Sequence, residues 1–298
     1  MTTPLFTVVI PTFNRPEKLA KCLGSLAEQT LPPSKFDVII IDDSGRQGEV
    51  DDRVLRDRGI SSKICRQHHS GPAAARNLGA SAARGRYLAF TDDDCCPAPD
   101  WLETLLGRFE TTGDASLIGG RVVNALSDDL YAAASQLLVD YMYAYFNVDA
   151  DRAMLLTSNN FCVPRALFLD VGGFDTAFSD AGGEDRELCL RLARAGRRLV
   201  YATEAVVFHF HDMTLQSFFC QHLAYGRGSA VLRARSRACG YGPIPLEPAS
   251  FYVELLRYPL KQRTGAGRSL CLSALFALSQ AANTIGYAHA CLKTGMRS

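Results

Sequence analysis

The sequence predicts an α/β protein: a Rossmann-like domain with a mostly parallel sheet, followed by a helical C-terminal extension. Short apolar runs alternate with segments of helical periodicity through the first ~210 residues. Several of these apolar runs end in acidic residues, and ligands of open α/β sheets bind at the carboxyl ends of strands. The chain is 47% hydrophobic and has a net charge of +1, which is typical of a folded protein and does not favour a nucleic-acid partner.

The expected strands of the N-terminal half are short, apolar and bounded by turn residues. They cover residues 6–10, 38–41, 63–66 and 87–90. A helix that opens at Pro16 places Leu19, Leu23 and Leu26 on one face, and an Ala-rich helix follows over residues 73–83. Because the strand at 38–41 is apolar at every position, we expect it to be buried on both faces of the sheet.

Further along, an amphipathic helix is expected over 184–195, where it ends at Gly196. Two strands follow, at 199–201 and 205–210. The character then changes to a long helix with several arginines over 215–237 and a Gly/Pro-rich break at 240–248. We therefore predict a catalytic domain over residues 1–214 and a helical, membrane-associated or soluble extension over 215–298.

The last segment has no charged residue between Arg268 and Lys293, so it is long enough to span a bilayer. Polar residues within it, such as Asn283 and His289, would be costly in hydrocarbon unless they are paired. A buried helix, a helix on the membrane surface and a true span all stay open, and the flanking basic residues would suit anionic headgroups. The N-terminus lacks the basic region of a secretory signal, so we expect a cytoplasmic protein, at the inner face of the membrane if the tail binds there.

The strongest chemical feature is Asp92-Asp93-Asp94, directly after an expected strand. Three clustered carboxylates repel one another unless a cation is present. Mg²⁺ and Mn²⁺ prefer carboxylate oxygens and share their remaining positions with water and phosphates. The triplet therefore predicts a site for Mn²⁺ or Mg²⁺, with an Asp-rich turn or helix cap as the plain alternative.

Two further segments suit a negatively charged nucleotide. Asp42-Asp43 ends a neighbouring strand, where carboxylates bind a base or ribose, although Asp-Asp-Ser-Gly is also an ordinary turn. Residues 71–77 begin a helix whose free N–H groups could face an anion, with Arg76 close by. There is no GxxxxGK[ST] motif and no GxGxxG motif after the first strand, so neither a P-loop ATPase nor a nicotinamide enzyme is supported.

The remaining candidates are acidic residues beside glycines, paired histidines and cysteines. Glu184 and Asp185 follow Gly182-Gly183 and suit a general base in a glycine-lined pocket, or a helix cap. His209 and His211 share one face of a strand, and one of them could complete a metal site.

Ten cysteines occur without any CxxC pair, and Cys95-Cys96 lacks the spacing of a metal clamp. We therefore expect buried free thiols, as at Cys22, Cys65, Cys162, Cys189 and Cys220.

In this order, the segments resemble family 2 glycosyltransferases with a GT-A fold. The resemblance covers roughly residues 5–215 and rests on residues 8–15 (VVIPTFNR), 41–44 (IDDS), 71–77 (GPAAARN), 90–94 (FTDDD), 172–175 (GGFD) and 183–185 (GED). It implies an inverting transfer from a nucleotide diphosphate sugar, with uridine as the commonest base, to a carbohydrate or lipid-linked acceptor. Cell-envelope or polysaccharide synthesis is the expected setting.

The resemblance also implies roles for individual residues. Asp185 would be the general base, and the acceptor loop would include Asn160, Gly183 and Glu184. Metal ligands would be Asp94 and Asp92 of the DxD motif, with His209 a better placed third ligand than His211. The donor would be bound by Pro11, Thr12, Asn14, Arg15, Asp42, Asp43, Arg76, Asp92 and Asp93.

Two alternatives remain. A sugar nucleotidyltransferase also binds nucleotides on a Rossmann-like sheet, but it would favour a Gly-rich basic loop after the first strand, where this chain has Pro11 to Arg15 with no glycine. A non-catalytic sugar-nucleotide or lipid-binding protein could keep the fold without activity. Such a protein would need neither the acidic triplet nor Asp185.

Overall fold

The computed structural model describes residues 3–45, 50–178, 182–262 and 264–294. The chain forms two compact units. The first comprises Met1–Ala125, Phe146–Ser179 and Asp185–Phe210, and the second comprises Leu126–Tyr145, Asp180–Glu184 and His211–Ser298. The second unit thus takes in a segment well before residue 214, and the assignment of a catalytic domain to 1–214 and an extension to 215–298 stays a prediction.

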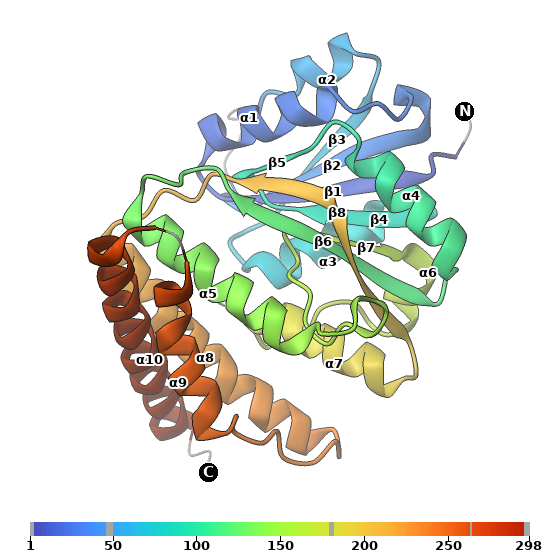
Figure 1. The fold of residues 1–298 in the computed structure, drawn as a ribbon. Helices are drawn as coiled ribbons and strands as arrows, with labels where there is room; N and C mark the ends of the chain where they lie inside the picture. Colours follow the sequence, from blue (N-terminus) through green and yellow to red (C-terminus); the bar gives the residue numbers. More distant parts are fainter. Residues whose placement is uncertain (1–2, 46–49, 179–181, 263, 295–298) are drawn as a thin grey trace. The chain divides into compact units, whose positions relative to one another are not determined.

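An eight-stranded sheet forms the centre of the first unit (Figure 1). Its order is β3-β2-β1-β4-β7-β6-β8-β5. The strands are β1 (Phe6–Thr12), β2 (Phe36–Asp42), β3 (Ser61–Arg66), β4 (Tyr87–Thr91), β5 (Cys95–Pro97), β6 (Ser116–Asn124), β7 (Asn160–Pro164) and β8 (Arg198–His209). Strands β1 to β4 run parallel, as do β6 and β8, whereas β7 and β5 pair antiparallel with their neighbours. The predicted α/β class with a mostly parallel sheet is confirmed.

Helices cover both faces of this sheet because alternate residues of each strand point to opposite sides. Val8 and Ile10 belong to the core that also holds side chains of α1 (Pro16–Ala27), α2 (Arg53–Asp57) and α4 (Trp101–Thr112). Helix α3 (Pro72–Ala82) approaches Val9, on the other face, so closely that a Cβ on Gly79 would lie 2.4 Å from Val9 Cγ1. Helix α6 (Arg165–Asp170) and most of α7 (Glu184–Arg194) also belong to this unit.

Several elements between residues 95 and 164 were not expected, and one expectation was wrong. The two strands predicted at 199–201 and 205–210 are one continuous strand, β8. Thr203 and Glu204 are exposed within it, which makes the apolar run look interrupted, and the irregularity of the pairing lies between Gly120 and Arg121 of β6. An exposed pair at a bulge therefore imitates a break between strands.

The second unit is helical: α5 (Leu130–Phe146), α8 (Leu215–Ala238), α9 (Ala249–Arg257) and α10 (Ala266–Thr294) pack around one apolar core, with a short 3₁₀ turn over Tyr258–Lys261 between α9 and α10. Helices α8 and α10 are in close contact through glycines. A Cβ on Gly226 would lie 2.1 Å from Asn283 O, and one on Gly286 would lie 2.1 Å from Leu223 O. Close backbone approach therefore fixes this helix pair.

Helix α10 is the segment predicted as buried, interfacial or membrane-spanning. Residues Ala266–Lys293 are long and apolar enough to cross a bilayer by length and composition, and 39% of the most apolar window is buried. Leu272, Phe276 and Ala282 pack inside the unit, whereas Leu270 and Ile285 are 63% and 53% exposed. The helix is thus half core and half surface, and its exposed half carries no charge between its ends.

The expectation of buried free thiols is only partly right. Cys22, Cys162 and Cys189 are buried and unpaired, and Cys65 is partly buried. Cys220 is exposed, because it lies on the outer face of α8 between the buried residues Phe218 and His222.

Candidate active site

The carboxyl ends of β1, β2 and β4 bring the predicted donor-binding residues together. Thr12 ends β1 and is in register with Asp42 at the end of β2, and β4 pairs with the other side of β1. Thr12 Oγ1 donates a hydrogen bond of 2.7 Å to Asp93 Oδ2, across 81 residues of chain. Parallel strands of similar length necessarily end at the same edge of the sheet, so the predicted juxtaposition follows from the topology.

Two arginines pair with the three carboxylates of Asp92-Asp93-Asp94. Asp92 Oδ1 lies 2.6 Å from Arg76 Nη2, a guanidinium that is itself buried. Asp93 Oδ1 lies 2.9 Å from Arg15 Nη2, and Asp94 Oδ2 lies 3.1 Å from Arg15 Nη1. Side-chain cations of the protein therefore balance the acidic cluster, as the repulsion argument requires.

Asp93 is the most buried member of the triplet, with no exposed surface. Burial raises the pKa of Asp93 to about 6, an effect that the charge of Arg15 opposes and the charge of Asp94 reinforces. The Asp93 carboxylate is stabilised by Thr12 and Arg15 and is not a freely solvated ligand. Asp94 differs from Asp93, because its Oδ2 faces Arg15 whereas its Oδ1 faces His209 and Cys95.

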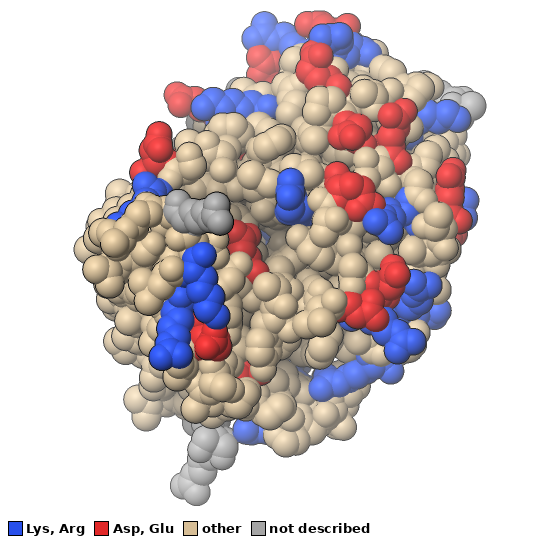
Figure 2. All heavy atoms as spheres, viewed as in Figure 1, with Lys and Arg blue, Asp and Glu red and all other residues tan. Residues whose placement is uncertain are grey.

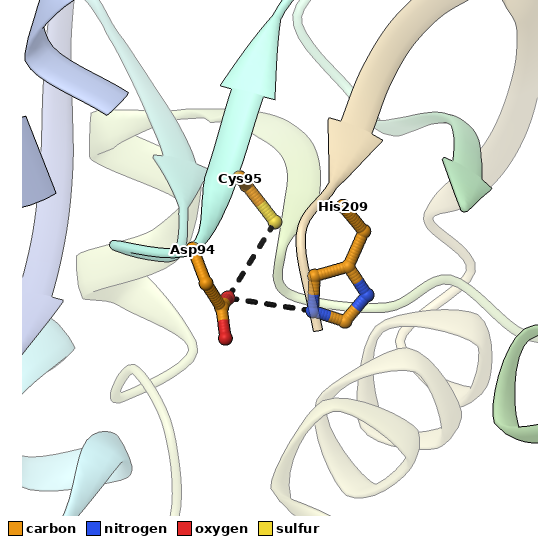
Figure 3. Close-up of side chains that lie close together, drawn as sticks. All are labelled: Asp94, Cys95 and His209. Atoms are coloured by element: carbon orange, nitrogen blue, oxygen red, sulfur yellow. Dashed lines mark hydrogen bonds and ion pairs between the residues drawn. The ribbon is translucent and has the colours of Figure 1, made fainter. Parts of the chain in front are cut away.

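Asp94 meets His209 because β5 and β8 pair in a fixed register. Cys95 is opposite His209 in that antiparallel ladder, and the peptide N–H of Phe210 donates to Asp94 O at 2.8 Å. His209 Nε2 consequently lies 3.3 Å from Asp94 Oδ1. Figure 3 shows the imidazole and the Cys95 thiol both directed at the Asp94 carboxylate, with Sγ 4.0 Å from Oδ1.

These three side chains offer one ligand atom each, and the atoms all lie within 4.8 Å of one another. Cys95 is fully buried, and burial raises the pKa of its thiol well above the ordinary value. Carboxylate oxygen and imidazole nitrogen suit a divalent transition-metal ion. The alternative ligand His211 belongs to the second unit, where its Nε2 lies 3.5 Å from Gln221 Nε2.

The two neighbouring aspartates at the end of β2 have different hydrogen-bond partners. Asp43 accepts hydrogen bonds from the loop before α3: Gln67 Nε2 at 2.7 Å, Ser70 N at 2.9 Å and Gly71 N at 3.0 Å, while His69 Nδ1 is 2.8 Å away. Asp42 Oδ1 accepts from the Ser44 N–H at 3.0 Å, and Asp42 Oδ2 lies 3.6 Å from Arg66 Nε. Asp43 therefore holds the loop that starts α3, whatever it contributes to donor binding.

The turn after β1 presents Arg15 to the acidic triplet. Asn14 has a positive φ of 55°, a left-handed conformation that asparagine adopts more readily than most residues. Pro16 then begins α1, and Lys18, two residues further along, places Nζ 3.9 Å from Asp94 Oδ2. Sequence reasoning missed Lys18, although its spacing of three from Arg15 on a helix was a usable signal.

Asp185 lies near the start of α7, as predicted. Its Oδ2 accepts from Ser158 N at 3.4 Å and its Oδ1 from Arg186 N at 2.7 Å. Glu184 belongs to the second unit, where its Oε2 accepts from Gly182 N at 2.9 Å, and Gly183 has a positive φ of 105°. The roles of these residues stay predictions.

Asn160, predicted near the acceptor, is completely buried. Its Oδ1 accepts from Trp101 Nε1 at 2.8 Å, and its Nδ2 donates to the main-chain oxygens of Arg121 and Ala205 at 3.0 and 2.9 Å. The amide thus joins β7 to β6, β8 and α4. Any part in acceptor binding stays a prediction.

The architecture is that of GT-A glycosyltransferases. The chain resembles the mannosyltransferase PcManGT of Pyrobaculum calidifontis, solved with GDP-Man and Mn²⁺, with a TM-score of 0.61 and 20% identity, covering 99% of this chain and 80% of that one. It also resembles GalNAc-T7, solved with UDP, GalNAc and Mn²⁺, with a TM-score of 0.58 and 15% identity, covering 99% and 57%. At these identities the likeness shows the fold.

The chain belongs to glycosyl transferase family 2, whose family model matches residues 7–172. It is 33% identical over 238 residues to a pre-mycofactocin glycosyltransferase of Mycobacterium tuberculosis, covering 77% of this chain and 47% of that protein. It is 30% identical over 217 residues to a glucosyl-dolichyl phosphate glucuronosyltransferase of Haloferax volcanii, covering 68% of each chain. This chain therefore spans about half the length of the first of these relatives and about two thirds of the second.

Proposed function

We propose that this protein transfers a sugar from a nucleotide diphosphate sugar, a UDP-sugar in the first instance, to an acceptor hydroxyl with inversion of configuration. The observation that carries the proposal is the arrangement at the carboxyl edge of the sheet. There Thr12, the Asp92–Asp94 triplet and His209 are held together by strand pairing and side-chain hydrogen bonds. Membership of a glycosyltransferase family is the second support.

Asp94 Oδ1 and His209 Nε2 lie 3.3 Å apart and can both coordinate one divalent ion, Mn²⁺ or Mg²⁺. Asp92 lies in the same loop and is 27% exposed, so it is available as a further ligand. When bound, such an ion would offset the negative charge that develops on the leaving diphosphate. Fold neighbours solved with Mn²⁺ support the choice of a divalent ion.

The protein's own residues supply binding and proton transfer. Pro11 and Thr12 end β1, Asn14 and Arg15 follow it, Asp42 and Asp43 lie at the end of β2, and Arg76 lies in α3. Together these residues bind the nucleotide. Arg15 and Arg76 add positive charge beside the diphosphate. Asp185 accepts the proton of the acceptor hydroxyl as that oxygen attacks the anomeric carbon from the face opposite the departing diphosphate.

The acceptor is a carbohydrate or a lipid-linked glycan of the cell envelope, modified at the cytoplasmic face of the membrane. One relative is named for a dolichyl phosphate substrate, which is a lipid carrier. The exposed half of α10 agrees with this setting, because Leu270, Ile285 and Leu292 are all more than half exposed and Arg268 and Lys293 flank them. An apolar face with cations at its ends suits contact with an anionic bilayer surface.

The test is a turnover assay with a panel of UDP-, GDP- and dTDP-sugars, with Mn²⁺, with Mg²⁺ and with a chelator. We expect metal-dependent release of a nucleoside diphosphate from one donor class. Asp185→Asn should retain donor binding and lose roughly 10²–10⁴-fold in rate, while Asp170→Asn, at an exposed carboxylate of α6, should behave as the parent. Release of pyrophosphate would instead indicate a nucleotidyltransferase, and donor binding without turnover would indicate a non-catalytic protein.

A further inference from the structure

Cys95 lies directly beside the two residues assigned to the metal. It follows Asp94 in the chain and is opposite His209 in the ladder between β5 and β8. Its thiol points at the same carboxylate oxygen that the imidazole faces (Figure 3), at 4.0 Å from Asp94 Oδ1. From the sequence we expect Cys95 to be a buried free thiol, because the spacing of Cys95 and Cys96 matches no metal motif. Strand pairing places His209, which is 114 residues away in the chain, opposite Cys95.

The three ligand atoms have a suitable separation. Metal–sulfur and metal–nitrogen bonds of about 2.3 and 2.0 Å place the ligands of a tetrahedral ion about 3.5 Å apart. Asp94 Oδ1 is 3.3 Å from His209 Nε2 and 4.0 Å from Cys95 Sγ, and the three atoms all lie within 4.8 Å of one another. Small side-chain adjustments would thus bring all three atoms into one coordination sphere.

The charge arrangement also favours this face of Asp94. Its Oδ2 is turned to Arg15 and Lys18, at 3.1 and 3.9 Å. Its Oδ1 is turned to His209 and Cys95 instead. A cation that binds Oδ1 therefore meets an imidazole and a thiol, while the protein's own cations lie on the other oxygen.

We infer that Cys95 is a third ligand of the divalent ion at Asp94 and His209, and that it gives the site a preference for thiophilic ions such as Co²⁺ and Zn²⁺ over Mg²⁺. On binding, the thiol releases its proton to solvent and the sulfur coordinates as the thiolate. Soft thiolate ligands select Zn²⁺ and its chemical relatives, whereas Mg²⁺ takes oxygen ligands. The inference rests on the proposed metal site and adds a ligand to it.

The test is a titration of the full chain with Co²⁺, followed by near-ultraviolet absorption, in which a thiolate ligand produces a charge-transfer band. We expect a band that saturates at one equivalent in the parent and is lost in Cys95→Ser. Co²⁺ affinity should fall at least by the roughly 10–100-fold that loss of a supporting outer-shell group causes, with a smaller change for Mg²⁺. Cys96→Ser is the matched control, because this neighbouring cysteine of β5 points to the opposite side of the strand.

Other outcomes are equally informative. Co²⁺ binding that depends on Asp94 and His209 but shows no thiolate band, or a band that survives Cys95→Ser, would overturn the inference and leave the proposed metal site intact. Binding of Mn²⁺ and Co²⁺ that is unchanged by Asp94→Asn and His209→Ala would instead refute the proposed site itself. X-ray absorption of the Co²⁺-loaded parent detects a sulfur ligand without any substitution, so the question is answerable even if the Cys95 variant does not fold.

Discussion

Arg15 lies 3.1 Å from Asp94 and 2.9 Å from Asp93, so one guanidinium connects two adjacent carboxylates of the acidic triplet. The two acids are almost entirely buried, whereas the Arg15 side chain is 43% exposed. The Arg15 side chain can therefore move away from the two carboxylates without losing much of its own packing. It is a counter-ion of Asp93 and Asp94, while Arg76 pairs with Asp92.

Substitution of Arg15 by Gln should destabilise the metal-free protein and increase the stabilisation that Mn²⁺ provides. Loss of the partly exposed ion pair costs about 1 kcal/mol, which corresponds to a melting temperature lower by about 2–4 °C. Thermal unfolding with and without Mn²⁺ measures both effects. Arg53→Gln, which breaks an exposed pair with Asp51, is the control, and equal melting temperatures of the two variants without metal would contradict the counter-ion role.

Asp43→Asn should loosen the loop before α3. The carboxylate accepts the N–H groups of Ser70 and Gly71 and the side-chain amide of Gln67, and the amide of Asn replaces one accepting oxygen with a donor. Leaving buried groups without partners costs about 1–3 kcal/mol in the free energy of unfolding. Urea denaturation measures the loss, and proteolysis within residues 67–71 should become faster; Asp57→Asn, on the exposed surface of α2, should change neither.

His222 should make stability fall in mild acid. Burial lowers its pKa from 6.5 to about 4. Between about pH 6.5 and pH 4 the unfolded chain binds a proton that the folded chain does not, so the free energy of unfolding decreases as the pH drops through this window, by roughly 3 kcal/mol at its lower end. Well above pH 6.5 the group is uncharged in both states, and this loss is absent.

The measurement is urea denaturation of the parent and of His222→Gln from pH 7 to pH 4.5. The variant should lack this part of the acid-induced loss, so the difference between the two proteins should change steadily below pH 6.5. His289→Gln, at an exposed position of α10, should follow the parent. A parallel pH dependence in parent and His222→Gln would show that His222 is not the responsible group.

Leu270→Glu should weaken membrane binding if the exposed face of α10 contacts lipid. Leu270 is 63% exposed, and burial of a leucine side chain in an apolar phase stabilises by about 1.5–3 kcal/mol. Binding to phosphatidylglycerol-containing vesicles should therefore weaken roughly tenfold to hundredfold. Val148→Glu is the control, because Val148 is 86% exposed in the other unit. Equal sedimentation of both variants with vesicles, or no binding by the parent, would contradict the membrane surface.

Figure 2 shows one face of the molecule, on which acidic and basic side chains are interspersed and separated by areas without charged side chains. This mixed distribution agrees with the net charge of +1. A surface on which the two signs of charge alternate does not attract a polyanion such as a nucleic acid over long distances.

The strands of the N-terminal half were predictable because each is a short apolar run ended by a turn. Residues 6–10 and 38–41 fall inside β1 and β2, and the triplet follows β4 as expected. Strand β7 was not predictable, since an isolated five-residue run carries no information on whether it pairs parallel or antiparallel. The three-residue β5 is too short to show any periodicity.

For this protein the sequence alone determined the chemistry of the acidic triplet and the strand ends at which Thr12, Asp42 and Asp92–Asp94 lie, because residue types and strand ends are local properties. Tertiary structure decided which groups share each carboxylate. Pairing of β5 with β8 brings His209 to Asp94 and Cys95, and the turn at Asn14 brings Arg15 to the other oxygen of Asp94. These contacts depend on register between segments far apart in the chain, which residue spacing does not encode.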